Sequence, residues 1–240
     1  MRRIIVMAIS VILALTLAMP VAFGQVGQGS KASGTASELA ADWWQWALSK
    51  PVEENPLLGE YSGGPKCDGQ PVTETPGKKW FLAGTFDGST VERTCTMPVG
   101  TQLFFPVGNV VFLITEPNEN EEIARQFVNE YIDDVLADPE LSISVTVDGK
   151  EIKQKRIVRA DSPLFTATLP EDNLFSASGL GAGNYDAVAD GLWAALPPLS
   201  KGEHTIHFEI SAPSAPLGGL EQDNTYYLTV VNKHQASATE

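Results

Sequence analysis

The spacing of apolar positions divides the chain into strand-like and helix-like parts. From Trp80 to Thr115, apolar, β-branched and aromatic runs are interrupted at short intervals by Gly and Pro. Such runs are typical of strands that are buried on at least one face. From Leu141 onward, apolar and polar residues alternate in short runs between turn residues such as Asp148-Gly149. This second pattern predicts further strands and hairpins.

Two segments show a helical period instead. Residues 36–49 follow the capping-box pattern Thr35-x-x-Glu38, and their narrow polar stripe leaves a wide apolar arc, which predicts a helix sunk into the body of the protein. In residues 119–137, apolar side chains recur every four residues until Asp138-Pro139 ends the pattern. We expect this second helix to cover one face or edge of a sheet.

Together these patterns predict a mostly β fold with two helices. We expect an antiparallel β-sandwich, of jelly-roll or immunoglobulin-like form, covered by a Trp-rich helix and an amphipathic helix. The sandwich would be one domain over residues 35–232, with a tail at 233–240. Within it, residues 79–86 and 91–97 are predicted to pair as a hairpin. Residues 171–190, rich in Gly and Ser, are predicted to form a loop.

The N-terminus has the form of an export signal. Arg2 and Arg3 precede a continuous apolar run at 4–18, and small residues follow where a signal peptidase would cut. We therefore predict a signal peptide at 1–24 and a flexible leader at 25–34. The alternative is an uncleaved anchor, although the run is shorter than a spanning helix needs. No later segment is predicted to cross a membrane, so we expect a secreted, periplasmic or cell-surface protein.

The chain has a formal net charge of −14, which disfavours some classes of binding partner. A strongly acidic surface repels nucleic acid and anionic membranes, so we expect neither as a partner. The surplus of carboxylates would suit cation binding, but it does not establish it.

The chain has two cysteines, Cys67 and Cys95. In an exported protein, an even number of cysteines usually forms disulfides, so we predict a bond that pins the Pro- and Gly-rich segment around Cys67 to the sheet. A pair of metal-binding thiolates is the alternative.

Tryptophans are the most conspicuous candidates for ligand binding. Trp43, Trp44 and Trp46 crowd into one helical turn, where adjacent side chains point about 100° apart and cannot form one flat platform. Core packing therefore explains the cluster best. Stacking on a ligand is the alternative, with Trp44 and Trp193 as its candidate residues.

Candidate metal ligands are scattered. Oxygen ligands on the Gly-rich segment could hold a structural calcium ion. Its candidate ligands are Asp172, Asn184, Asp186 and Asp190. His204 and His207 lie three apart, so a strand places them on opposite faces and they cannot share one ion without distortion. We expect His204 to be a hydrogen-bonded core residue and His207 to face solvent or the other sheet.

Several strings of residues resemble a family of exported prokaryotic proteins of unknown function. They are WWxW at 43–46, WFLAGT at 80–85, RTCT at 93–96, LFFPV at 103–107 and GEHTIHF at 202–208. The resemblance covers most of the chain after residue 34. It implies export and a shared fold, and it transfers no catalytic residue.

No nucleophile elbow, zinc-protease motif, phosphate loop or dinucleotide fingerprint occurs in the sequence. The hypothesis that we favour is a non-enzymatic binding or surface-assembly module whose partner is an extracellular glycan or another surface protein. The alternatives are a secreted hydrolase that cuts polysaccharide with two carboxylates, and a metal-dependent extracellular protein.

Overall fold

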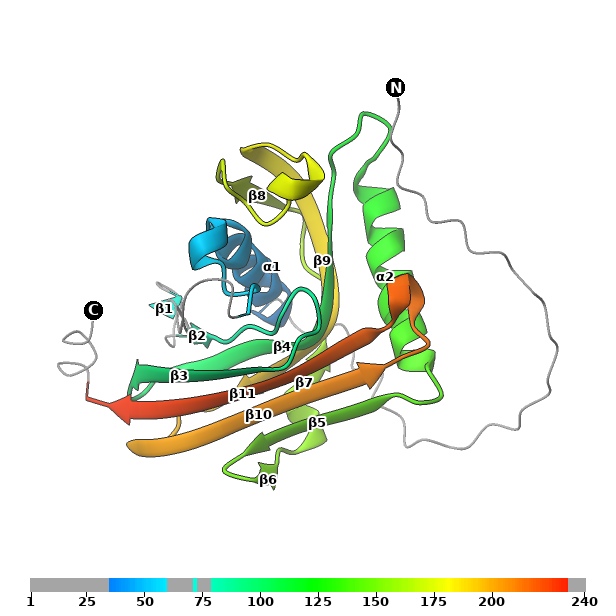
Figure 1. The fold of residues 1–240 in the computed structure, drawn as a ribbon. Helices are drawn as coiled ribbons and strands as arrows, with labels where there is room; N and C mark the ends of the chain where they lie inside the picture. Colours follow the sequence, from blue (N-terminus) through cyan, green and yellow to red (C-terminus); the bar gives the residue numbers. More distant parts are fainter. Residues whose placement is uncertain (1–34, 60–70, 73–78, 233–240) are drawn as a thin grey trace.

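The computed structural model describes residues 35–59, 71–72 and 79–232 (Figure 1). The predicted signal peptide, leader and tail, and also Cys67, lie outside these residues. The described residues form two α-helices, α1 (Thr35–Leu48) and α2 (Glu121–Ala137). Both agree with the predicted segments to within two residues at each end. Short 3₁₀ turns occupy η1 Val52–Glu54, η3 Gln154–Arg156, η4 Ser176–Ser178 and η5 Pro216–Gly218.

The strands form two sheets, which confirms the prediction of a β-rich sandwich with two helices. The first sheet contains β1 Pro71–Val72, β2 Lys79–Phe81, β4 Gln102–Leu113, β7 Ile157–Arg159, β8 Phe165–Leu169 and β9 Gly183–Leu196. The second runs in the order β3 Val91–Pro98, β11 Leu220–Val231, β10 Gly202–Ala212, β5 Ser142–Val147 and β6 Lys150–Glu151. Pairing is antiparallel except between β2 and β4 and between β3 and β11.

The predicted hairpin of residues 79–86 with 91–97 is wrong. β2 ends at Phe81 and pairs with β4, whereas β3 pairs with β11 in the other sheet. Between them the chain crosses from one sheet to the other. It is held there by hydrogen bonds from Trp43 Nε1 to the Leu82 carbonyl at 2.9 Å and from Tyr226 Oη to the Ala83 carbonyl at 2.7 Å. These long-range bonds replace the local ladder that a hairpin would have formed.

The predicted loop over residues 171–190 is wrong in its second half, which begins the long strand β9. The backbone of β9 pairs with β4 from Ala187 to Leu196. Its successive side chains face opposite layers: Ala187 and Ala189 pack in the cluster with α1, and Val188 packs with α2. Burial on both faces therefore outweighs the Gly- and Ser-rich composition.

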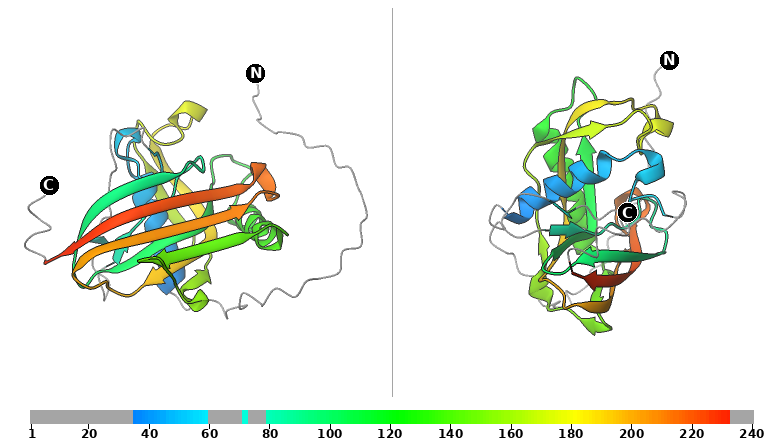
Figure 2. Two further views of the ribbon diagram at one scale, coloured as in Figure 1. Left: turned by 60° about the horizontal axis from the view of Figure 1, so that its bottom comes forward. Right: turned by 90° about the vertical axis from the view of Figure 1, so that its left-hand side faces the viewer.

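β4 and β9 also bend together. The pairing register shifts between Pro106 and Gly108, and Figure 1 shows both strands turning away from the second sheet towards β8 and α2. A β-bulge is the usual device for such a bend. The two views of Figure 2 show α1 on the side of this sheet opposite to β10 and β11.

Three apolar clusters follow from this layering. The largest lies between the sheets and includes Phe105, Phe208 and Leu228. The second lies under α1, where Phe104 and Trp193 stack with ring centroids 5.1 Å apart. The third is small and joins α2 to Val188.

No helix among the described residues is long and apolar enough to span a membrane.

Candidate functional site

A groove of about 990 Å³ lies beside the bent half of β4. Its lining includes all of β4 from Pro106 to Leu113. The crossing segment 84–88, the loop around Phe175 to Leu180, the start of β11 and the α2 residues Phe127 and Tyr131 complete it. The groove therefore follows one edge of a strand rather than the face of a sheet.

Within the part of the chain that the structure describes, that edge of β4 is open over most of its length. β2 pairs with β4 at Gln102–Phe104, and no strand of the described residues pairs with the same edge beyond Phe104. On the other edge, Ile114 N–H donates to the Asp186 carbonyl at 2.8 Å, which continues the β4–β9 ladder by one residue.

The alternation of hydrogen bonds between β4 and β9 determines which backbone groups of β4 face the groove. Antiparallel partners alternate between pairs that exchange hydrogen bonds and pairs that do not. Because Ile114 bonds to β9, Phe112 and Val110 belong to the bonded set, and the N–H and C=O groups of Asn109, Val111 and Leu113 point to the open edge. The next residue in that outward series, Thr115, donates its N–H to Glu119 Oε2 at 2.8 Å. A side chain thus closes the edge at its end.

Exposed apolar side chains surround the open edge. Leu217 is 73 % exposed, Phe86 is 53 % exposed and Phe127 is 37 % exposed, and all three line the groove. Phe86 packs edge to face on Phe175, with ring centroids 5.7 Å apart, and Phe127 packs on Phe112 with ring centroids 5.3 Å apart. Leu217 also has a φ of 63°. A left-handed backbone is uncommon for a bulky residue, and such strain concentrates at functional sites.

The crossing segment is held rigidly by a buried arginine. Arg93, 4 % exposed, donates to the carbonyl oxygens of Ala83 at 2.5 Å and Pro56 at 2.8 Å, and to Tyr226 Oη at 2.6 Å. Its guanidinium carbon lies 5.4 Å from the centre of the Tyr226 ring. Arg93 therefore ties the segment that carries Phe86 to β3 and β11.

Polar side chains at the groove mostly bond to the protein itself. Gln222 accepts from Thr85 N–H at 2.8 Å and donates to the Thr85 carbonyl at 2.6 Å. Thr85 Oγ1 donates to the Ser89 carbonyl at 2.8 Å. Two buried donors, Trp44 Nε1 and Asn109 Nδ2, have no hydrogen-bond partner among the described residues.

Carboxylates lie around the groove. Asp87, Glu116 and Glu221 are exposed and contribute to its lining. Hydrogen bonds from the Ser89 side chain and backbone lower the pKa of Asp87, so this group is negative at neutral pH. The groove thus combines apolar surface with negative charge.

The structure separates the two tryptophans that we predicted as ligand-stacking candidates. Trp44 lines the groove, although it is only 4 % exposed. Trp193 is fully buried and donates to the Ala160 carbonyl at 3.1 Å. Its place between Phe104 and Trp43 makes it part of the core under α1.

The four residues that we predicted as calcium ligands do not converge. Asn184 and Asp190 lie six residues apart on the extended strand β9, a separation of about 20 Å. Thr168 donates to Asn184 at 2.9 Å, Asp186 is exposed on the same strand, and Asp172 is exposed in the preceding loop. Three of the four candidates therefore lie on strand β9 rather than on a loop that could gather them.

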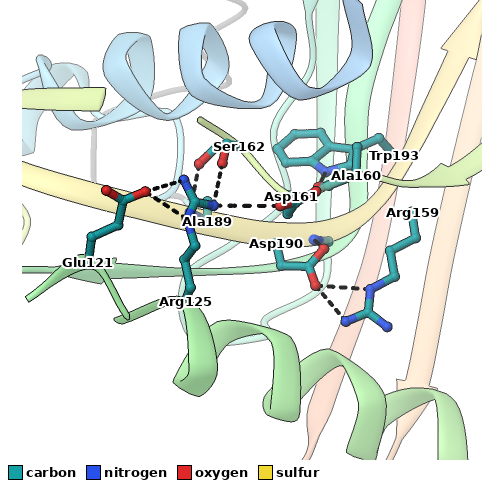
Figure 3. Close-up of polar contacts among 10 residues, drawn as sticks. Glu121, Arg125, Arg159, Ala160, Asp161, Ser162, Ala189, Asp190 and Trp193 are labelled. Carbon is teal, nitrogen blue, oxygen red and sulfur yellow. Dashed lines mark hydrogen bonds and ion pairs between the residues drawn. The ribbon is translucent and has the colours of Figure 1, made fainter. Parts of the chain in front are cut away.

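Asp190 instead binds Arg159, as Figure 3 shows, and Arg159 joins α2 to the sheet. The Asp190 carboxylate, 1 % exposed, accepts from Arg159 at 2.6 and 2.9 Å. Arg159 also donates to the Asn129 carbonyl at 3.0 Å and pairs with Asp133, both on α2. Burial raises the pKa of Asp190, and the guanidinium opposes that rise. Asp190 therefore has a structural partner already.

A second contact fixes the other end of α2. Arg125 bonds to Glu121 and to the Ser162 carbonyl, each at 2.8 Å, while Ala189 N–H donates to Ser162 Oγ at 2.9 Å (Figure 3). The two arginines hold α2 against the segment beside β9. Phe127 lies on α2 between the two contact points, Arg125 and Asn129, so it has a fixed position at the groove.

Cys95 is buried in β3, 3 % exposed, within the cluster between the sheets. Its predicted partner Cys67 lies outside the described residues, so the disulfide stays a prediction. His204 is half-buried and bonds through Nδ1 to Asp148 at 2.8 Å. His207 lies on the outer face of β10, with its Nε2 2.9 Å from Asp223 Oδ1.

Sequence reasoning missed the groove itself. Its main elements are an unpaired strand edge and side chains from distant segments, and neither has a local pattern. Two local features of the sequence could have pointed to the groove. Gly108-Asn109 interrupts an apolar run, and Phe86 precedes the turn Asp87-Gly88.

Comparisons with known proteins identify no relative by sequence. No family model and no curated protein matches the chain. Among solved structures, Amebosin aligns with 65 % of this chain and 100 % of its own at 12 % identity and a TM-score of 0.21. A cysteine protease inhibitor from Entamoeba histolytica aligns with 64 % of this chain and 96 % of its own, at 13 % identity and a TM-score of 0.22. A family 123 glycoside hydrolase from Clostridium perfringens aligns with 59 % of this chain and 23 % of its own, at 10 % identity and a TM-score of 0.23. These likenesses are slight, and neither the fold nor the function is argued from them.

Proposed function

We propose that this protein is a non-catalytic, extracytoplasmic binding module that receives an extended segment of another surface polypeptide in the groove beside β4. The observation that carries the proposal is the open edge of β4, with outward N–H and C=O groups at Asn109, Val111 and Leu113. Export is proposed from the basic and apolar N-terminus. The apolar groove and the open edge support a binding role.

Strand addition is the recognition mode that fits an open edge. A peptide that lies along such an edge forms backbone hydrogen bonds, and its alternate side chains enter the spaces on either side. The outward stretch from Asn109 to Leu113 is about 13 Å long. It matches a segment of about five residues. Natural proteins usually block or cover an unpaired strand edge, so an unpaired edge inside an apolar groove supports a binding role for that edge.

The side chains around the edge specify the chemistry of the partner. Phe86, Phe127 and Leu217 offer apolar contact, and the carboxylates of Asp87, Glu116 and Glu221 favour positive charge. We therefore propose a partner segment that alternates apolar residues with Lys or Arg. Charge complementarity of this kind speeds association and selects partners.

A glycan fits this surface less well than a polypeptide does. Sugar recognition needs many polar groups free to bond to hydroxyls, but Gln222 and Thr85 are already bonded to each other. The polypeptide is therefore the occupant that we propose, and a glycan becomes an outcome of the test.

The test measures binding of synthetic peptides and glycans to the purified protein by fluorescence polarisation. The peptide panel contains eight-residue segments that alternate Val or Phe with Lys, together with the same compositions in scrambled order and with Glu in place of Lys. We expect the alternating basic peptides to bind best. Phe86→Ala should weaken that binding at least tenfold, because aromatic anchors at the centre of an interface commonly contribute about 2 kcal/mol or more.

Leu164→Ala is the matched control. Leu164 is 41 % exposed but does not line the groove, so its replacement should leave peptide binding unchanged. Retention of a glycan with no retention of any peptide would contradict the polypeptide proposal. Equal losses in Phe86→Ala and Leu164→Ala would show that the peptides bind elsewhere.

A further inference from the structure

A second cluster of side chains lies on the outer face of the second sheet, independent of the groove. His207 and Glu209 are two residues apart on β10 and so point to the same face. Asp223 on β11 is the direct cross-strand neighbour of Glu209. One ligand atom from each of the three side chains lies within 4.8 Å of the others.

Two of the three side chains in this cluster are carboxylates that lie opposite each other on neighbouring strands. Like charges that are directly opposite on neighbouring strands destabilise a sheet, and Glu209 and Asp223 are such a pair. Asp223 Oδ1 lies 2.9 Å from His207 Nε2. Among the described residues, the Glu209 carboxylate has no hydrogen-bond or ion-pair partner. A divalent cation at this point would neutralise both carboxylates.

The geometry points to a site for a divalent transition-metal ion of the zinc type, which we propose is bound by His207 Nε2 and one carboxylate oxygen each of Glu209 and Asp223. One imidazole nitrogen and two carboxylate oxygens form a ligand set that zinc accepts at bond lengths of about 2.0–2.2 Å. The imidazole favours zinc, copper or nickel over calcium and magnesium, which take oxygen ligands.

The surroundings leave room for the remaining ligands. A hollow of about 290 Å³ lies beside the cluster, and its lining includes Glu209, Asp223, Ser211 and Glu221. Water can therefore complete the coordination on the solvent side. Because its ligands come from β10 and β11, the bound ion would link these two strands across the outer face of the sheet.

The experiment is isothermal titration of ZnCl₂ into purified, untagged protein from which metal has been stripped, repeated with CaCl₂. We expect one zinc ion per chain and no comparable heat from calcium. His207→Ala should weaken zinc binding by at least about tenfold, since even an outer partner of a metal ligand commonly has an effect of that size. Glu209→Gln should weaken it too, and zinc should raise the melting temperature of the wild type.

His204→Ala is the matched control. His204 lies on the same strand but pairs with Asp148, so its loss should leave zinc affinity unchanged. The absence of zinc binding by the folded wild type would overturn the proposal. So would equal losses in His204→Ala and His207→Ala, or calcium binding as tight as that of zinc. Circular dichroism of each variant separates loss of the site from loss of the fold.

Discussion

The two halves of β4 are both rich in apolar residues, but their surroundings differ. Before the bulge, Leu103, Phe104 and Phe105 are each no more than 1 % exposed, and the strand has β2 on one edge and β9 on the other. After the bulge, Val111 and Leu113 are half-buried, and β9 is the only strand of the described residues beside them. One strand can therefore form core in its first half and present an unpaired edge for binding in its second. The change depends on where its neighbours end.

The first half should respond to truncation as core does. Phe104→Ala removes a ring that stacks on Trp193, and it should lower the free energy of unfolding by about 3–5 kcal/mol, as large core truncations do. Urea denaturation measures the loss. Phe86→Ala, at the exposed groove, is the contrast and should change the free energy of unfolding by less than about 0.5 kcal/mol. Similar losses in both variants would remove the distinction between the halves.

Arg93 connects the core to the groove, so its replacement should affect both. Arg93→Met would leave the Pro56 carbonyl without its donor. It would also remove one of the two donors to the Ala83 carbonyl and one of the two donors to the Tyr226 hydroxyl, since that hydroxyl still donates to the Ala83 carbonyl and accepts from the Ala83 N–H. An unsatisfied buried group costs about 1–3 kcal/mol and each lost hydrogen bond costs less, so we expect a total loss of roughly 2–4 kcal/mol in unfolding experiments. Peptide binding should weaken as well, because the segment that carries Phe86 loses its anchor. Unchanged stability would show that Arg93 does not anchor it.

The bend between the halves requires glycine on β9. A Cβ at Gly191 would lie 2.5 Å from Asn109 Cβ and 2.9 Å from Asn109 Cα, so the backbone must move. Gly191→Ala should lower the free energy of unfolding by roughly 1–3 kcal/mol and alter the open edge. Gly181→Ala is the control, because a Cβ there meets nothing within 4 Å. Equal melting temperatures for Gly191→Ala and wild type would contradict the role given to the bend.

The smallest effect should come from a pair remote from both halves. Burial lowers the pKa of His204, but the hydrogen bonds to the Asp148 carboxylate and the Ser200 carbonyl outweigh burial and raise this pKa above 6.5. Hydrogen bonds from the Thr205 N–H and then from His204 lower the pKa of Asp148 below 3.8. The stabilisation from His204 is therefore complete below pH 6.5 and is lost as pH rises through its folded-state pKa. That from Asp148 is complete above pH 3.8 and is lost as pH falls through its folded-state pKa.

Asp148→Asn tests this pair. The pKa of His204, followed by NMR, should fall in the variant. The stability deficit of the variant should shrink at high pH, where His204 is neutral in both proteins and the carboxylate differs from the amide only in its bond to the Thr205 N–H. Peptide binding at the groove should not change. A His204 pKa that is the same in variant and wild type would show that Asp148 does not stabilise the imidazolium.

The sequence predicted the parts of the fold that depend on local periodicity. Both helices, the strand that contains Ile206 and Phe208, and the turn at Asp148-Gly149 follow from spacing and turn chemistry within a few residues. The hairpin between 79–86 and 91–97 failed because β2 pairs in parallel with β4 in one sheet, whereas β3 pairs in parallel with the distant strand β11 in the other. No local pattern specifies such pairing.

The same limit explains why the sequence did not predict the candidate sites. His207 and Glu209 share a face by simple alternation, but Asp223 joins them only through the register of β10 against β11. The open edge of β4 likewise depends on where β2 ends. The prediction that Trp44 and Trp193 are ligand-binding candidates rested on residue type alone. Both are buried, and of the two only Trp44 lines the groove.

The measurement that tests the account most directly is residue-resolved amide hydrogen exchange along β4 in the free protein. Exchange reports whether each N–H is bonded and how readily that bond opens. We predict that the N–H groups of Asn109, Val111 and Leu113 exchange much faster than those of Val110, Phe112 and Ile114, which bond to β9, and that a bound peptide slows the fast set. Equal protection of the two sets in the free protein would mean that the edge is already closed, and it would contradict the proposed binding site.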